Sequence, residues 1–251
     1  MARYLTHRFD RLAAIIVLAI ASLAFATGAK SQSEPRHLTL LGIPSATVAP
    51  QGAAFASLQF TNQRPGPATG SDASLSFGVG FGDAENAIGV QLSAEITSTT
   101  DSLGDSGYFD LRFSRRISGG AVPTYLGIGA RRLGGWGDAS GIDPASDLTL
   151  TFFPFIDTPR GKAPLMISVG AGTHVRANQT EPGGYAGIGY GFNSSFAASA
   201  SWYGDHAIIG VSYAPTTLQN VQFSAAVVDA FDSTNDRRAV FSVNLLFPKA
   251  F

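Results

Sequence analysis

The sequence contains no cysteine. This absence excludes a disulfide scaffold, a thiolate metal site, a cysteine nucleophile and the acylated cysteine of a bacterial lipoprotein. Charged residues are also scarce, at 14% of the chain, against about 25% in an ordinary soluble domain. Beyond residues 1–29, no apolar run is long enough for a membrane-spanning helix. We therefore expect no helical membrane domain, and the slightly acidic balance of charges makes nucleic acid a poor partner.

The first 29 residues combine a basic start with an apolar run at positions 13–26. That run is too short to span a bilayer as a helix. Small residues offer a cleavage site after Ala26 or after Ala29. These features predict a secretory signal peptide at 1–29. An uncleaved membrane anchor is the alternative, and the absence of a charged stop-transfer segment disfavours it.

Alternation of apolar with small or polar residues dominates the rest of the chain. Phe77 and Val79, for example, flank Gly78. A β-strand points successive side chains to opposite faces, so each alternating segment predicts a strand with one apolar face. A tilted strand needs about 9–11 residues to cross a membrane, and most of these segments have that length. The segments lie at 53–62, 72–82, 87–97, 107–117, 122–132, 147–156, 164–175, 184–193, 195–204, 207–214, 219–229 and 237–247. We expect an all-β protein in which residues 53–251 form a single closed antiparallel transmembrane β-barrel of about 12 strands (range 10–14).

The connections between these segments alternate in length. Those after even-numbered strands are short, and those after odd-numbered strands are mostly longer and acidic, as in 133–146. Transmembrane barrels have short periplasmic turns and longer outer loops, so both chain termini are expected in the periplasm. Two connections depart from this rule. Residues 157–163 are long for a turn, and Asp205 with His206 is short for an outer loop.

A soluble barrel or sandwich would also alternate, so the nature of the two faces decides between them. The second face here carries mostly Gly, Ser and Ala, which suits a crowded or water-lined interior better than a solvated exterior. Aromatic residues stand near the strand ends on the apolar face, as in the two aromatic girdles of a membrane barrel. The girdle residues are Phe60, Phe81, Phe192, Trp202, Tyr213 and Phe247. The pattern favours the membrane barrel.

The last residues, 239–251, alternate and end on Phe251. Together with the signal peptide, the alternating strands and the loop pattern, this ending resembles the Gram-negative outer-membrane β-barrel proteins of the porin-like class. The resemblance implies export by the Sec route, residence in the bacterial outer membrane, and contact with its lipid and lipopolysaccharide. It also implies that the barrel-assembly machinery reads Phe251 as an assembly signal. It leaves the oligomeric state open.

Residues 30–52 precede the first predicted strand and have no place in the barrel wall. We expect them to form an N-terminal periplasmic segment or a segment docked in the lumen. Within them, residues 43–46 followed by 50–52 resemble the opening of outer-membrane barrels associated with exopolysaccharide secretion. That likeness is short and implies, at most, a component of such a secretion system.

Polar and charged residues on the inward parity form the candidate lumen lining. They are Gln59, Gln91, Glu95, Tyr108, Asp110, Arg112, Arg116, Arg131, His174, Gln222 and Asn244. Two readings stay open. Opposed charges could line a pore and set its solute preference, or they could pair in an internal network that plugs a narrow barrel. The many inward glycines leave space for a pore or for a docked segment.

No catalytic, cofactor-binding or metal-binding residue is predicted. His174 and Ser168 share a strand parity but lie too far apart along it for a nucleophile–base pair. The glycine-rich runs lack the following helix of a nucleotide loop. Acidic residues of the outer loops show no calcium-loop spacing and are expected to be solvated. They are Asp101, Asp105, Asp138, Asp143, Asp147, Asp232 and Asp236.

The expected function is a passive channel for small hydrophilic solutes, not an enzyme. One alternative is a non-conducting structural or surface-interaction barrel that acts through its outer loops. Another is the exopolysaccharide component named above. A lipid-modifying outer-membrane enzyme ranks last, because no catalytic pair can be read from the sequence.

Overall fold

The computed structural model describes residues 38–64, 70–99, 103–159 and 161–251. The predicted signal peptide at 1–29 lies outside the described residues. These described residues form β-strands and one 3₁₀ turn (η2, Gly137–Gly141). The strands are β1 (Ala54–Thr61), β2 (Asp72–Gly82), β3 (Gly89–Ile96), β4 (Gly107–Ser118), β5 (Thr124–Trp136), β6 (Ala145–Phe152), β7 (Phe155–Thr158), β8 (Gly161–Arg176), β9 (Glu181–Gly191), β10 (Phe196–Tyr203), β11 (His206–Tyr213), β12 (Val221–Val228) and β13 (Arg238–Phe247).

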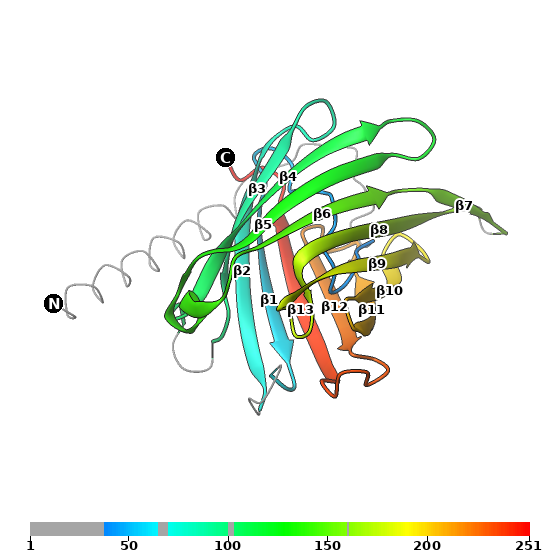
Figure 1. The fold of residues 1–251 in the computed structure, drawn as a ribbon. Coiled ribbons are helices and arrows are strands. Elements are labelled where there is room, and N and C mark those ends of the chain that lie inside the picture. Colours follow the sequence, from blue (N-terminus) through cyan, green and yellow to red (C-terminus); the bar gives the residue numbers. More distant parts are fainter. Residues whose placement is uncertain (1–37, 65–69, 100–102, 160) are drawn as a thin grey trace.

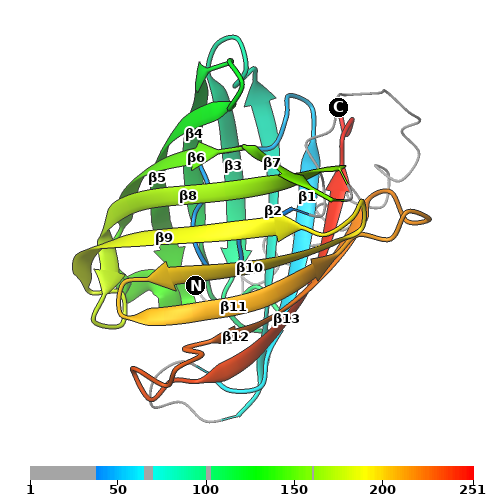
Figure 2. The ribbon, with the colours of Figure 1, turned by 90° about the vertical axis from the view of Figure 1, so that its right-hand side faces the viewer.

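Twelve of these strands close into an antiparallel barrel (Figures 1 and 2). Each strand pairs with its neighbour in the chain, except that β6 pairs directly with β8. The ring closes where β1 pairs with β13, with Ala54 opposite Phe247 and Thr61 opposite Val240. Closure leaves no open sheet edge, which a barrel in lipid requires. The prediction of an all-β closed antiparallel barrel with about 12 strands is confirmed.

Strand β7 does not belong to the ring. It pairs only with the first residues of β8, with Phe155 opposite Pro164 and Thr158 opposite Gly161. The two strands form a hairpin that extends past the ends of β6 and of the wall-forming part of β8, beyond the rim of the barrel (Figure 1). The sequence places a long turn at 157–163, and the structure replaces that turn with this hairpin. It forms because the residues on both sides of the turn are themselves extended and can pair.

The two faces of the barrel wall are opposite in character. Large apolar side chains point outward and are exposed, for example Ile128 (53%), Leu148 (53%) and Ile188 (46%). Small hydroxyl side chains point inward, and Thr149 and Thr151 are fully buried. A water-soluble barrel would reverse this arrangement. The apolar exterior and polar interior are those of an outer-membrane barrel, as the sequence resemblance implies.

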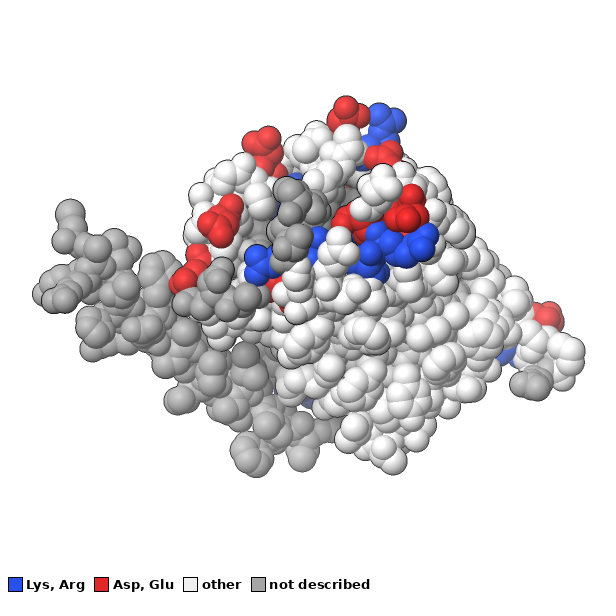
Figure 3. Space-filling model, turned by 90° about the horizontal axis from the view of Figure 1, so that it is seen from below, with Lys and Arg blue, Asp and Glu red and all other residues white. Residues whose placement is uncertain are grey.

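The barrel has two unlike ends. The loop end carries the connections 62–71, 97–106, 137–144 and 229–237. The turn end carries the shorter connections and the end of β13, together with Phe251, whose ring lies 5.6 Å from that of Phe81. Charged residues gather over the loop end, while the side of the barrel is almost free of them (Figure 3).

One loop is shorter than expected from the sequence. Residues 133–146 are predicted as a loop, but β5 continues to Trp136 and η2 follows. The pairing of β4 with β5 contains register shifts, which carry the extra residues of β5. Trp136 then packs against Phe109 with 5.3 Å between ring centroids and donates a hydrogen bond to the carbonyl of Gly104. These contacts stabilise the extension.

Candidate functional site

Residues 38–52 run through the inside of the barrel, and we call them the lumen segment. Leu38 lies against Gly189 near the turn end of β9. The segment then reaches its deepest point at Leu41–Pro44, where Ser201 donates a hydrogen bond of 2.8 Å to the Leu41 carbonyl. It returns to the turn end, where the Gly52 amide bonds the Gly80 carbonyl. Both ends of the segment therefore lie at the turn end.

Glycines of the wall make room for this segment. A Cβ at Gly127 would lie 2.7 Å from Cα of Ala46, and a Cβ at Gly187 would lie 2.8 Å from Cδ1 of Ile43. Both distances are too short for carbon atoms in contact. The backbone is also held directly, because the Ala46 amide donates 2.8 Å to Thr151 Oγ1 and the Ala49 amide donates 2.9 Å to Gln91 Oε1. The space beside these inward glycines is therefore filled by the lumen segment and does not form an open pore.

The apolar residues of the lumen segment create a core inside the barrel. Leu38, Leu40 and Ile43 are nine-tenths or more buried. They belong to one cluster with inward side chains of β8–β12, among them Val175, Tyr185, Tyr203, Ile208 and Val228. Burial of apolar surface contributes roughly 25 cal/mol per Å², so this cluster holds the segment more firmly than its few hydrogen bonds do.

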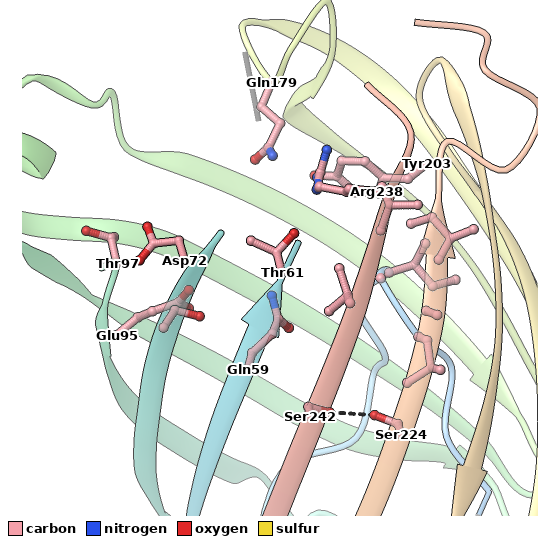
Figure 4. Close-up of a pocket in the computed structure, with 18 of the residues that line it drawn as sticks. Gln59, Thr61, Asp72, Glu95, Thr97, Gln179, Tyr203, Ser224, Arg238 and Ser242 are labelled. Carbon is pink, nitrogen blue, oxygen red and sulfur yellow. Dashed lines mark hydrogen bonds between the residues drawn. The ribbon is translucent and has the colours of Figure 1, made fainter. Parts of the chain in front are cut away.

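A cavity of 610 Å³, which we call the outer cavity, opens above the deepest part of the lumen segment toward the loop end (Figure 4). Leu41, Ile43 and Pro44 form its floor. Figure 4 shows Glu95 and Thr97 on one side of the cavity and Arg238 on the other. Arg238 forms an ion pair with Asp236, and Arg64 pairs with Asp72 at 3.1 Å. The loop-end half of the lumen is thus a cavity with charged residues in its lining, bounded below by the lumen segment.

A buried ion cluster borders this cavity. The carboxylate of Asp147 on β6 has a fully buried side chain and accepts hydrogen bonds of 2.9 and 3.0 Å from Arg112 Nη2. Arg131 Nε lies 3.3 Å from the same carboxylate. Two guanidinium groups therefore share one carboxylate. Gly129 of β5 lies directly opposite Asp147 in the strand pairing, and a Cβ at Gly129 would lie only 2.5 Å from Asp147 Oδ1.

Two tyrosines complete the cluster. Tyr185 and Tyr203 are direct partners in the pairing of β9 with β10, and their rings stack with centroids 5.7 Å apart. The Tyr185 hydroxyl lies 2.6 Å from Thr149 Oγ1 and donates 3.3 Å to Asp147 Oδ2, while Arg131 Nη2 donates 3.3 Å to the Tyr203 hydroxyl. Hydrogen bonds of this kind offset the cost of burying Asp147.

The opposite side of the lumen is uncharged and polar. We call it the polar wall, and it consists of the inward side chains Ser57 of β1, Gln222 and Ser224 of β12, and Ser242 and Asn244 of β13. These side chains are bonded to one another in sequence: Ser57 to Asn244 (2.6 Å), Asn244 to Gln222 (3.3 Å) and to Ser242 (3.4 Å), and Ser224 to Ser242. The dashed line in Figure 4 marks the last of these.

The polar wall borders the outer cavity and also a second cavity. Ser224 and Ser242 line the outer cavity. Ser57, Gln222 and Asn244 line a cavity of 190 Å³ nearer the turn end. Phe55 also lines this second cavity, and its ring fills the space that a side chain at Gly78 would take. A polar surface therefore runs along one side of the lumen past the lumen segment.

The structure brings some of the predicted lumen residues together and separates others. Gln59, Glu95, Arg112 and Arg131 line the outer cavity. Gln222 and Asn244 belong to the polar wall, and Gln91 holds the lumen segment. Asp110 accepts 2.8 Å from the Arg132 amide, and Tyr108 lies opposite Glu95 in the pairing of β3 with β4. Arg116 lies apart at the turn end, where it bonds Glu85 at 2.9 Å.

His174 does not join these residues. A shift in the pairing of β8 with β9 between Gly172 and Arg176 breaks the simple alternation. Val175 is consequently the residue buried in the interior cluster, while His174 Nδ1 lies 2.9 Å from Thr173 Oγ1. Ser168 is fully buried and shares a 2.7 Å hydrogen bond with Thr151. His174 and Ser168, which the alternation of the sequence predicts on one strand face, therefore do not form a common site.

Asp147 is the residue that sequence analysis misplaced. It is expected in a solvated outer loop, but it is the third residue of β6 and points into the lumen. The signal was present, because Asp147 shares its parity with the inward Thr149 and Thr151. The sequence carries no comparable signal for Tyr185 and Tyr203, because residue type alone does not tell whether a tyrosine points into the barrel or out of it.

The predicted girdle residues are exposed on the outer surface, except Phe247. Phe60 and Trp202 stand toward the loop end and are each 45% exposed. Of the predicted girdle residues at the turn end, Phe81, Phe192 and Tyr213 are exposed. Phe247 is only half-buried rather than exposed. The terminal Phe251 is 70% exposed.

The described part of the chain contains no group of three or more His, Asp or Glu side chains placed to hold a metal ion. It also contains no helix long and apolar enough to cross a membrane.

Comparison with known proteins gives matches to solved structures alone. No protein-family model and no curated protein matches the chain. An outer-membrane channel from Pseudomonas putida F1 is 9% identical, covers 82% of this chain and 99% of its own, and has a TM-score of 0.46. Outer membrane phospholipase A from Escherichia coli is 11% identical over 80% of this chain and 94% of its own, with a TM-score of 0.44. A porin mutant from Rh. blastica is 13% identical over 78% of this chain and 98% of its own, with a TM-score of 0.34. At such TM-scores the likeness carries no inference about the function of this chain.

Proposed function

We propose that the protein is an outer-membrane channel that passes small hydrophilic solutes, and that it is not an enzyme. The observation that carries the proposal is the polar wall. It places hydroxyl and amide side chains from the outer cavity to the second cavity without a charged residue between them. A surface of hydroxyl and amide groups exchanges hydrogen bonds with water and with uncharged polar solutes.

The lumen segment limits what passes. It fills the side of the lumen formed by the wall glycines and leaves a cavity between itself and inward side chains of β1, β12 and β13. The remaining route is narrow, because the second cavity measures 190 Å³ and Phe55 borders it. The proposed channel therefore favours small solutes and has a low conductance.

Single-channel recording in planar lipid bilayers tests this proposal. The mature chain should give small, steady, ohmic current steps. Ser224→Phe would place a ring between the two cavities, and we expect it to lower the conductance severalfold. Val227→Phe is the matched control, because Val227 is the 40% exposed outward residue of the same strand. A folded protein without current steps would reject the channel.

The second candidate is a non-conducting barrel that acts through its loops. The buried ion cluster and the lumen segment favour it, because together they fill much of the interior. Silent bilayers in the experiment above, from protein that migrates as a folded barrel in gels, would support this candidate.

A further inference from the structure

The outer cavity has two unlike walls. On one side, β11–β13 present aliphatic side chains to it, namely Ile208, Ala226, Val228 and Val240. On the other side, β3–β5 present Glu95, Arg112 and Arg131. The floor, made by Leu41, Ile43 and Pro44 of the lumen segment, is apolar. Charged side chains thus line one side of the cavity, and apolar side chains line the other.

The lumen segment covers only part of the aliphatic wall. Ile208 and Val228 are buried in the cluster with Leu38, Leu40 and Ile43, whereas Ala226 and Val240 pack against that cluster and stay partly exposed to the cavity. A partly exposed apolar side chain gains free energy when an apolar group of a ligand covers it. Ala226 and Val240 therefore point to a ligand with an apolar part.

The charged wall carries both signs of charge within the same cavity. Arg112 and Arg131 share the single carboxylate of Asp147, and both side chains keep some exposed surface in the cavity, 13% and 20%. Two guanidinium groups on one carboxylate leave an excess of positive charge at this wall, which favours an incoming carboxylate. Glu95, on the neighbouring strand, offers a carboxylate to a cationic group.

We propose that the outer cavity binds an amino acid with an aliphatic side chain, as its free zwitterion. The α-carboxylate lies toward Arg112 and Arg131, the α-ammonium toward Glu95, and the side chain toward Ala226 and Val240. A cavity of 610 Å³ lies within the range of about 300–1,000 Å³ usual for small-molecule sites. The inference deepens the proposed function by naming the solute class, and it rests on the cavity of that proposed channel rather than on conduction.

Ligand titration by NMR tests the site without any need for current. The folded mature chain is titrated in lipid nanodiscs with L-leucine, glycine, 4-methylpentanoate or isopentylamine, and binding is followed by saturation transfer to ligand protons. We expect saturable binding of L-leucine, with at least about tenfold weaker binding of each of the other three, because each lacks the apolar chain or one charge. The methyl protons of leucine should receive the strongest transfer.

Variants then assign the contacts. Glu95→Gln should weaken L-leucine about tenfold and leave 4-methylpentanoate unchanged, since the latter has no ammonium group. Val240→Thr, which keeps the shape but adds a hydroxyl, should weaken L-leucine roughly threefold and leave glycine unchanged. Arg116→Gln, at the turn end outside this cavity, is the matched charge-removing control and should have no effect.

Any of three results would overturn the inference. The first is the absence of saturable leucine binding in protein that is folded by gel migration and circular dichroism. The second is equal binding of leucine and glycine. The third is leucine binding that Glu95→Gln does not change. Leucine binding in a protein that gives silent bilayers keeps this site and rejects only conduction, whereas conduction without leucine binding rejects only this site.

Discussion

Ala46 of the lumen segment and Gly127 of β5 touch backbone to backbone. A Cβ at position 127 would lie 2.7 Å from Cα of Ala46 and 3.1 Å from its Cβ. No side chain larger than hydrogen fits at Gly127 while the segment stays in place. The position of the lumen segment against β5 therefore depends on Gly127.

Gly127→Leu should displace the lumen segment from β5. A larger open cross-section follows, so we expect the single-channel conductance to rise by roughly twofold or more. The displaced segment should also become sensitive to protease from the turn end. Gly120→Leu is the control, because a Cβ at Gly120 meets no atom within 4 Å. Unchanged conductance and unchanged protease resistance in a folded Gly127→Leu protein would contradict the arrangement.

Phe55→Ala should widen the route at the turn end. Phe55 borders the second cavity and fills the space facing Gly78. Removal of the ring adds space beside the polar wall, so the conductance should increase. Phe60→Ala, on the same strand but 45% exposed on the outer face, should leave the conductance unchanged. Each variant removes one phenyl ring from β1. An equal change in conductance for both would therefore show that Phe55 does not limit passage.

Asp147→Asn should destabilise the barrel strongly. It leaves Arg112 and Arg131 buried without their shared counter-charge. Breaking a buried ion cluster by removal of one partner costs about 3–5 kcal/mol. Urea unfolding in lipid vesicles measures the loss. The exposed pair of Arg116 and Glu85 supplies the control, and Glu85→Gln there should cost about 0–1 kcal/mol. Equal losses for the two variants would mean that Asp147 is not buried as described.

The loop after β12 is built around the carboxylate of Asp229. It accepts hydrogen bonds from the Ser233 amide (2.7 Å), from the amide and hydroxyl of Thr234 (2.9 and 2.7 Å), and from the Asp236 amide (3.2 Å). Burial alone would raise the pKa of Asp229, but the bonds from Thr234, Asp236 and Ser233 outweigh it and lower the pKa to about 2.

A pH dependence follows from this lowered pKa. The stabilisation of the loop is fully present above pH 3.8, the ordinary pKa of the carboxyl, and is lost as the pH falls through about 2. Asp229→Asn should remove it at every pH and accelerate cleavage of the loop by protease roughly tenfold at pH 7. Asp232→Asn, an exposed neighbour paired with Arg237 at 3.6 Å, should leave cleavage unchanged. A wild-type loop that loosens near pH 5 would contradict the assignment.

The hairpin of β7 and β8 should be dispensable for closure of the barrel. The wall pairing of β6 with β8 begins at Phe152 and Ile167. The amide of Leu165 already bonds the carbonyl of Pro154 at 2.8 Å. Replacement of residues 155–164 by Asn-Gly therefore leaves a two-residue hairpin turn between Pro154 and Leu165. We expect the shortened chain to fold and to keep its melting temperature within about 5 °C, which corresponds to a change of about 1 kcal/mol or less. Failure to fold would show that β7 takes part in closure.

Much of the fold follows from local pattern. Period-two alternation is a property of neighbouring residues, so the strands and their outward faces are predicted by sequence to within a few residues, as at β2 and β3. The errors fall where the pairing of two strands departs from simple register. The register shifts of β5 and β8 are such places, and they misled the predictions for 133–146 and for His174.

The alternating strands and the apolar outer face can be predicted from the amino-acid order alone, because consecutive residues of a strand point to opposite faces. The contents of the barrel interior become known only from the folded structure. Ala46 meets Thr151, and Arg112 meets Asp147, through contacts between residues far apart in the chain. Those contacts depend on closure of the ring and on the path of the lumen segment, and neither leaves a periodic trace in the sequence.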